Sequence, residues 1–312
     1  MPGIKRQLHN LAKRNIRRVF RIGQGFGVDI LPRHFYSSVP DVRHLENTTY
    51  WRKPTSMYGV PGADVDEQLR FASDCCPPQM RQSVKEMGLH VYASQENGVP
   101  GYGEVEADFL YCFICRHKPA KIVQVGAGVS TAIILKAAAD SGYKVDLTCV
   151  DPFPETYLRK IGSEGKIKLL AEPAQEVTLS VLTELGTNGM LFVDSTHTVK
   201  VGSEVNRIVL EALPRLSNGT FVHFHDIFFP YDYQRSILTE PFFNCESTLL
   251  HAFLSCNARY TLRASLSMLH YARPDQLKEL ILNYRPQANQ EGVRPDNVEG
   301  HFPSAAYLQV IQ

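Results

Sequence analysis

The class of fold is indicated first by the stretch Val123-Gln124-Val125-Gly126-Ala127-Gly128-Val129-Ser130-Thr131. An apolar run typical of a buried strand leads into a turn with two glycines, and a helix is predicted from Ser130 to Ala139. Glycines in such a turn let the backbone bend tightly and approach a ligand closely. We interpret the stretch as a nucleotide-type loop whose cofactor contacts are Gln124, Gly126, Ala127, Gly128, Ser130 and Thr131. Because two glycines are a weak signal, a purely structural turn is the alternative.

An acidic residue ends the next predicted strand. Asp151 follows the apolar run from Val145 to Val150 and lies 25 residues after Gly126. A carboxylate near this offset commonly binds the ribose hydroxyls of a nucleotide-like cofactor. We therefore expect Asp151, with Pro152 beside it, to contact an adenosine ribose. The alternative is a cap or turn residue before Pro152.

Apolar runs alternate with helix-like stretches beyond residue 121. The predicted strands cover 122–125, 145–150, 167–170, 190–193 and 220–224, and a second helix of this region is predicted from Ser203 to Ala212. This alternation predicts an α/β fold, with a Rossmann-like, doubly wound and mostly parallel sheet. Upstream, helices are predicted over 66–87 and 108–117. We divide the chain into an N-terminal helical and irregular extension (1–100), the Rossmann-like domain (101–275) and a C-terminal tail packed on it (276–312).

Polar side chains follow the two later strands. Asp194, Ser195 and His197 come after the strand that ends at Val193, and the next strand carries His223, His225 and Asp226. The carboxyl ends of parallel strands meet at the edge where ligands bind, so we expect Asp194, His197, His225 and Asp226 to converge. Carboxylates and imidazoles suit a divalent cation, and a free histidine could accept a proton. For His223, a buried hydrogen-bonded role in the strand is equally well supported.

Several motifs resemble those of class I S-adenosylmethionine (SAM)-dependent methyltransferases, specifically the methyltransferase-24-like family. The similarity runs from about residue 30 to residue 260. It rests on six elements: Phe35-Tyr36-Ser37-Ser38-Val39-Pro40-Asp41, the Gly126 loop, Val150-Asp151-Pro152, Val193-Asp194-Ser195-Thr196-His197-Thr198-Val199-Lys200, Val222-His223-Phe224-His225-Asp226-Ile227-Phe228, and Phe229-Pro230-Tyr231-Asp232-Tyr233. The resemblance implies that residues 101–275 bind SAM and transfer its methyl group to a hydroxyl of a small molecule or sugar. Thr131, which stands where a dinucleotide-binding loop would carry a third glycine, agrees with SAM.

Sugar O-methyltransferases of macrolide biosynthesis are similar in using an Asp-x-x-His element and a later acidic pair to hold magnesium. By that resemblance Asp194, His225 and Asp226 are metal-site positions and His197 is the general base, with Asp194 also catalytic. Asp194 and Ser195 are further expected among the cofactor contacts. His225 replaces an acidic residue, which favours a softer metal than magnesium or no metal, so Mg, Mn and Fe stay open. Gln124 stands where many relatives carry an acid, and its amide would bind the methionine amino group more weakly.

Aromatic and polar residues are candidates for contacts with the methyl acceptor. An aromatic arm contributes Tyr36, and the segment after Asp226 contributes Tyr231 and Tyr233, with His197 and His223 beside them. Aromatic rings suit a sugar or a planar substrate. The identity of the acceptor does not follow from the fold.

Composition narrows the partners and the compartment. The formal net charge is +1, which gives no global attraction for nucleic acid. Seven cysteines do not resemble a secreted disulfide framework, so we expect a cytoplasmic protein. No stretch has the roughly 20 consecutive apolar residues of a transmembrane helix. A basic amphipathic helix from Ile4 to Phe20 is expected to dock on the domain or to form a homo-oligomer; contact with a membrane surface is the alternative.

Two other functions compete with methyl transfer. One is a non-catalytic protein that keeps the SAM-binding fold and binds a ligand or partner. The other is an oxygenase-like enzyme on the same fold, suggested by similarity to cephalosporin hydroxylase-type relatives and by the histidine-rich strand. Iron in the purified protein would favour the second.

Overall fold

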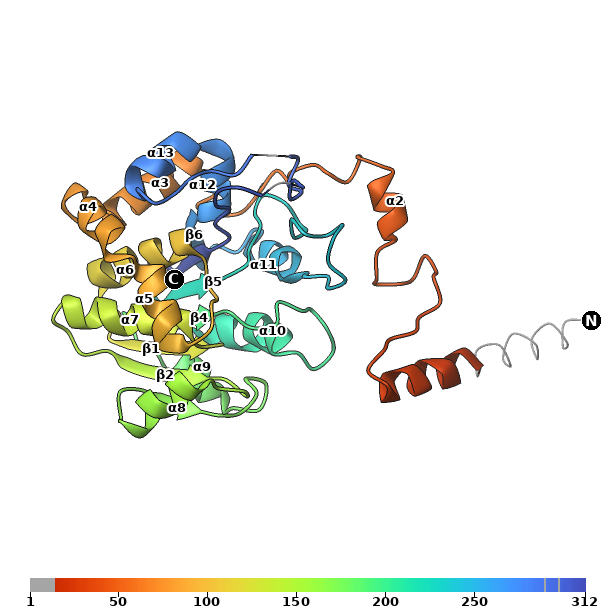
Figure 1. Cartoon of the computed structure of the whole chain (residues 1–312), viewed down its shortest axis with the longest axis horizontal. Helices are drawn as coiled ribbons and strands as arrows, with labels where there is room; N and C mark the ends of the chain where they lie inside the picture. The colour runs from red at the N-terminus through yellow and green to blue at the C-terminus, as the bar shows by residue number, and fades with distance from the viewer. Residues whose placement is uncertain (1–14, 289, 297) are drawn as a thin grey trace, which may run out of the picture. The chain divides into compact units, whose positions relative to one another are not determined.

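The computed structural model describes residues 15–288, 290–296 and 298–312 (Figure 1). The chain divides into two units, Met1–Trp51 and Arg52–Gln312. In the first unit, residues 15–25 are helical and α2 spans Val42–Glu46, where the Asp41 side chain accepts a hydrogen bond from the His44 N–H. Most of the helix predicted from Ile4 to Phe20 lies outside the described residues.

A seven-stranded sheet forms the centre of the second unit. Its strand order is β3-β2-β1-β4-β5-β7-β6. The strands are β1 (Lys121–Val125), β2 (Asp146–Val150), β3 (Lys168–Leu170), β4 (Met190–Val193), β5 (Phe221–Phe224), β6 (Tyr260–Ser265) and β7 (Ala306–Val310). The first five strands run parallel, whereas β7 is antiparallel to both β5 and β6. The predicted α/β fold with a mostly parallel sheet is confirmed.

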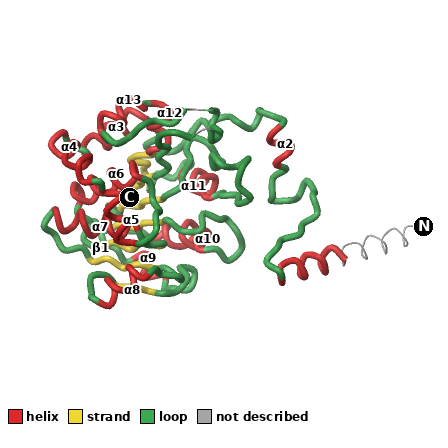
Figure 2. The backbone as a smooth tube through the Cα atoms, in the orientation of Figure 1, coloured by secondary structure: helices red, strands yellow, loops and turns green. Residues whose placement is uncertain are grey.

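Helices cover both faces of this sheet, and Figure 2 shows the yellow strands enclosed by red helices. Alternate residues of a strand point to opposite faces. Ile122 and Phe192 pack with one set of helices: α3 (Val65–Cys75), α4 (Pro78–Met87), α5 (Leu89–Asn97), α6 (Glu104–His117), α7 (Val129–Asp140), α8 (Thr156–Ser163), α12 (Leu266–Ala272) and α13 (Pro274–Leu280). Val123 and Leu191 pack with the other: α9 (Leu179–Thr183), a π-helical turn (Ile208–Ala212) and α11 (Glu246–Leu254). The fold is therefore doubly wound.

Some elements differ from their predicted form. The helix predicted over 66–87 is two helices, because α3 ends at Cys75 and Pro78 begins α4. Proline lacks the N–H that would continue a helix but is well tolerated in a first turn. The helix predicted from Ser203 to Ala212 is the short α10 (Glu204–Arg207) followed by the π-helical turn. Among the described residues, no helix is both long and apolar enough to cross a membrane.

Candidate active site

The loop after β1 lies directly against the end of β4. Gly126 has a φ of +76°, and a Cβ added there would collide with the carbonyl oxygen of Asp194. The Asp194 N–H donates to the carbonyl oxygen of Val125 at 2.9 Å. Only a glycine combines this backbone conformation with so close an approach. The turn after β1 therefore packs directly against the backbone of Asp194.

Three of the predicted cofactor contacts form a buried polar cluster at the start of α7. The Gln124 amide nitrogen donates to the Ser130 hydroxyl at 2.6 Å, and its carbonyl oxygen accepts from the Thr131 hydroxyl at 2.8 Å. Thr131 Oγ1 also accepts from the N–H of Gly128 at 3.0 Å. All three side chains are almost fully buried. Their observed bonds hold the turn in shape, and direct cofactor contact by them stays a prediction.

Asp151 lines a cavity of about 500 Å³. One carboxylate oxygen accepts from the N–H of Ala127 at 3.2 Å and the other from the N–H of Phe153 at 2.8 Å. The cavity is bounded by the ends of β1, β2 and β4. Its lining includes Gly126, Asp151, Pro152, Phe153, Asp194, Ser195 and Glu204. Five predicted cofactor positions thus border one cavity: Gly126, Asp151, Pro152, Asp194 and Ser195.

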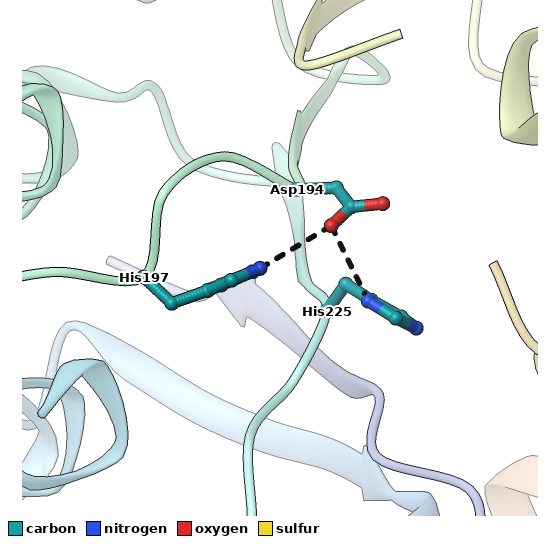
Figure 3. Close-up of side chains that lie close together, drawn as sticks. All are labelled: Asp194, His197 and His225. Carbon is teal, nitrogen blue, oxygen red and sulfur yellow. Dashed lines mark ion pairs between the residues drawn. The ribbon is translucent and has the colours of Figure 1, made fainter. Parts of the chain in front are cut away.

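Asp194 also belongs to a second group of side chains. Figure 3 shows His197 and His225 approaching the same Asp194 oxygen from two sides. The distance from Asp194 Oδ1 is 3.5 Å to His197 Nε2 and 3.3 Å to His225 Nδ1. Burial raises the pKa of Asp194, but the two imidazoles outweigh this effect and hold that pKa well below its usual range. Asp194 therefore carries a negative charge between two histidines.

His197 is held by a carboxylate on its other ring nitrogen. Its Nδ1 lies 2.8 Å from Glu246 Oε2, at the start of α11, while its Nε2 lies 3.6 Å from Asp226 Oδ2. The residue has a φ of +56°, a conformation rarely adopted by residues with a side chain. Burial lowers the pKa of His197, but Asp194, Glu246 and Asp226 outweigh it and raise the pKa well above its usual value. Three carboxylates therefore surround this ring.

His225 has a similar environment. Its Nδ1 faces Asp194, and its Nε2 lies 4.0 Å from Glu106 Oε1 on α6. Burial lowers the pKa of His225, but Asp194, Asp226 and Glu106 together raise it to about 9. Asp226 accepts a hydrogen bond from the Ser304 hydroxyl at 2.9 Å, which ties this end of β5 to the segment before β7. The four residues predicted to converge, Asp194, His197, His225 and Asp226, do lie together.

Of the other predicted substrate residues, His223, Tyr231 and Tyr233 make their contacts outside this group of four. His223 is fully buried, stacks on Phe192 with ring centroids 4.2 Å apart, and has Nε2 3.3 Å from the Tyr102 hydroxyl. Burial and the nearby charge of His225 hold the pKa of His223 well below its usual value, which fits the structural alternative. Tyr231 and Tyr233 pack against each other, and the Tyr233 hydroxyl donates to the carbonyl oxygen of Glu291. Tyr36 is exposed in the N-terminal unit.

Glu106 and Glu246 are site residues that the sequence did not single out for a role. Both are almost fully buried, and burial raises the pKa of each carboxyl group. Glu246 stands in Phe243-Asn244-Cys245-Glu246, which only loosely matches a Trp-Asn-Glu element of the family that the chain resembles. Glu106 lies in an apolar helix with no motif around it. Only its position opposite His225 reveals its relation to the site.

Comparison with known proteins finds a family match over part of the chain. Residues 123–227 match the family described as a methyltransferase domain. This segment begins in β1, contains the Gly126 loop and Asp151, and ends just after Asp226. Over this segment the chain is similar to methyltransferase domains.

Individual relatives are distant. An uncharacterised protein of Archaeoglobus fulgidus is 25% identical over 166 residues, which cover 50% of this chain and 74% of that protein. The SAH-bound methyltransferase PaMTH1 of Podospora anserina is 13% identical, with a TM-score of 0.40 over 91% of this chain and 99% of its own. The O-methyltransferase TomG of Streptomyces achromogenes, solved with SAM, is 12% identical, with a TM-score of 0.42 over 74% of this chain and 90% of its own.

Proposed function

We propose that the chain binds SAM in the cavity at the carboxyl ends of β1, β2 and β4 and transfers its methyl group to a hydroxyl of a small molecule or sugar. The observation that carries this proposal is the position of Asp194. This residue both lines the cavity and lies between His197 and His225. A cofactor bound in the cavity would therefore contact Asp194, which also contacts His197 and His225.

The chemistry required is modest. An acceptor oxygen attacks the methyl carbon of SAM in line, the bond from carbon to sulfur breaks, and SAH leaves as the acceptor hydroxyl loses its proton. Holding the two reactants in this alignment supplies much of the rate enhancement. A metal at the positions of Asp194, His225 and Asp226 would assist the loss of this proton, and His197 would accept it only from its neutral form.

A divalent metal would also fit a second set of donors, in which His197 takes the place of Asp226. Asp194, His197 and His225 each offer one donor atom, and these atoms lie within 4.8 Å of one another. A metal held by such residues lowers the pKa of a hydroxyl bound to it and orients that oxygen. The residues of the chain supply the cavity, the fixed carboxylate of Asp194 and the two oriented imidazoles.

The proposal also covers the methyl acceptor, the cellular compartment and the oligomeric state. Tyr36, Tyr231 and Tyr233 remain the candidates for acceptor contacts. All seven cysteines are free, which supports a reducing, cytoplasmic environment. Homo-oligomerisation through the basic N-terminal helix is tested by light scattering of the full chain and of a chain lacking residues 1–25.

An oxygenase-like enzyme is the second candidate function. The observation that favours it is the set of two histidines and one carboxylate, which is the ligand set of many non-haem iron oxygenases. Anaerobic purification followed by iron analysis and oxygen uptake would separate it from methyl transfer. Substrate-dependent oxygen uptake without SAH formation would favour the oxygenase.

Methyl transfer is tested with SAM labelled on its methyl group. The full chain is incubated with pools of sugars, phenols and other hydroxyl compounds, with and without added metal. We expect label in an acceptor and an equal amount of SAH, both lost in Asp194→Ala. SAM binding without acceptor-dependent SAH in any pool would contradict O-methyl transfer while leaving cofactor binding intact.

A further inference from the structure

Positive charge is concentrated in the N-terminal unit, Met1–Trp51. This unit has nine Lys or Arg and three Asp or Glu, which is a formal net charge of +6, whereas the rest of the chain has 24 and 29 and a net charge of −5. Its first 25 residues hold seven of the nine cations and no acid. A concentrated charge of one sign attracts partners of the opposite sign. The N-terminal unit is therefore suited to an anionic surface.

The helix at residues 15–25 places part of this charge opposite apolar side chains. With about 3.6 residues per turn, three arginines share one side of the helix: Arg17, Arg18 and Arg21. Ile16 and Val19 lie on the other side and are 43% and 46% exposed. No ion pair joins these arginines to any residue that the structure describes. The helix is thus basic and amphipathic.

The segment after this helix exposes its largest apolar side chains. Phe26, Phe35 and Tyr36 are 83%, 82% and 84% exposed, and the rings of Phe35 and Tyr36 have centroids 4.1 Å apart. Within residues 15–51, only Gly23 is buried. The described part of this unit therefore has no packed core of its own, and its apolar side chains need a partner to leave water.

We infer that residues 15–36, together with the cations that precede them in the sequence, bind the surface of an anionic lipid bilayer. The arginines contact the phosphate and carboxylate groups of the lipids, and the aliphatic and aromatic side chains enter the headgroup region. Clusters of about four to eight Lys or Arg on an amphipathic helix are typical of such surface binding. The inference goes beyond the proposed methyl transfer and does not depend on it.

Docking of the same residues on another macromolecule is the competing explanation. Two N-terminal units that paired with each other would bring two charges of +6 together, which opposes association. A nucleic acid would bind the arginines but would leave the aliphatic and aromatic side chains in water. An anionic bilayer matches both kinds of side chain, because it offers negative headgroups above an apolar interior.

The experiment is co-sedimentation of the full chain with lipid vesicles, without SAM. Vesicles of phosphatidylcholine alone are compared with vesicles in which one-fifth of the lipid is phosphatidylserine. We expect at least about 10-fold tighter binding to the anionic vesicles at about 0.1 M salt. Most of this difference should be lost at about 1 M salt, because the screening length falls from about 10 Å to about 3 Å.

Charge removal on the helix tests the role of the arginines. A triple-arginine variant, Arg17→Gln with Arg18→Gln and Arg21→Gln, is expected to bind anionic vesicles roughly 100-fold more weakly. The matched control removes the same charge from exposed positions of the second unit: Lys85→Gln with Lys160→Gln and Lys278→Gln. The control should bind the vesicles as tightly as the natural sequence.

Removal of exposed rings tests the apolar contribution. Phe26→Ala with Phe35→Ala is expected to weaken binding to anionic vesicles by roughly 10-fold or more. Tyr58→Ala with Phe242→Ala is the control, since these rings are 87% and 78% exposed in the second unit. Circular dichroism verifies that each variant is folded. If a variant fails to fold, the lipid and salt dependence of the natural sequence still tests the inference.

Three results would overturn the inference: no sedimentation with anionic vesicles, equal binding to vesicles with and without phosphatidylserine, or unchanged binding of the folded triple-arginine variant. Light scattering of the same proteins identifies one alternative. A molar mass that falls in the triple-arginine variant, without vesicle binding by the natural sequence, would assign these residues to a contact with a second copy. Because SAM and acceptor are absent, the outcome is separate from that of the proposed function.

Discussion

At the scale of single residues, the contact between Gly126 and Asp194 makes the first prediction. Gly126→Ala forces a Cβ into the Asp194 carbonyl oxygen at a φ of +76°. We expect the free energy of unfolding to fall by roughly 2–4 kcal/mol and SAM binding to be lost. Urea denaturation measures the first effect and calorimetry the second.

Gly142→Ala is the matched control for Gly126→Ala. Gly142 has a φ of +65°, but nothing lies within 4 Å of an added Cβ. Only the backbone penalty of about 1–2 kcal/mol applies there. Equal losses of stability in the two variants would show that the close approach to Asp194 is not what requires Gly126.

Whether a site residue can be predicted from the sequence depends on the secondary-structure element that carries it. Asp194, His197, His225 and Asp226 directly follow or end strands, so the rule that strand ends converge is enough to group them. Glu106 and Glu246 come from helices far away in sequence, and no periodicity reports which helix faces a strand end. Gln124 shows another limit, because its hydrogen bonds to Ser130 and Thr131 depend on side-chain directions within the turn.

At the scale of secondary-structure elements, the C-terminal strand gives the second prediction. β7 lies between β5 and β6, and four of its residues are fully buried: Ala306, Tyr307, Leu308 and Val310. Removal of residues 304–312 leaves β6 without a partner strand, exposes one edge of β5 and takes away the Ser304 hydroxyl that donates to Asp226. We expect the shortened chain to lose cooperative thermal unfolding, as measured by circular dichroism.

Removal of Gln312 alone is the control for this truncation. It lies beyond β7, where its carbonyl oxygen accepts from Arg259 at 3.2 Å. This change should shift the unfolding temperature little. If the chain that ends at Pro303 unfolded as cooperatively as the full chain, the assignment of β7 to the sheet interior would be contradicted.

The elements also show what a sequence pattern can and cannot determine. The five parallel strands were predicted within one residue at each end, because each strand reads as a short apolar run, and β1, β2, β4 and β5 are mostly buried. β6 was not predicted, although its buried and partly exposed residues alternate over its first four positions, which is the pattern of a half-buried strand. The break between α3 and α4 follows from Pro77 and Pro78, a local signal that the apolar periodicity of 66–87 obscures.

At the scale of the whole molecule, a buried histidine predicts how stability changes with pH. His270 is 3% exposed, and its Nδ1 lies 2.6 Å from the Tyr284 hydroxyl. Burial and the nearby charge of Arg235 lower the pKa of His270 to about 4. In the unfolded chain a histidine has a pKa of about 6.5. Below that pH the unfolded state binds more protons than the folded state.

The free energy of unfolding should therefore decrease as the pH falls from about 6.5 toward about 4. The contribution of His270 is on the order of 3 kcal/mol and is fully present above about pH 6.5. Urea denaturation across this range should show a smaller decrease for His270→Gln than for the natural sequence. The exposed His34→Gln is the control, and an unchanged pH dependence in His270→Gln would contradict this assignment.

The proposed function depends on one cavity, and Gly126, Asp151 and Asp194 all line it. The most direct test is calorimetric titration of the full chain with SAM, carried out in parallel on Asp151→Ala and on Asp146→Ala, an exposed residue at the start of β2. We predict saturable binding of one SAM per chain, unchanged in Asp146→Ala and abolished in Asp151→Ala. No SAM binding by the natural sequence, with or without metal, or equal binding by Asp151→Ala, would contradict the claim that this cavity is a SAM site.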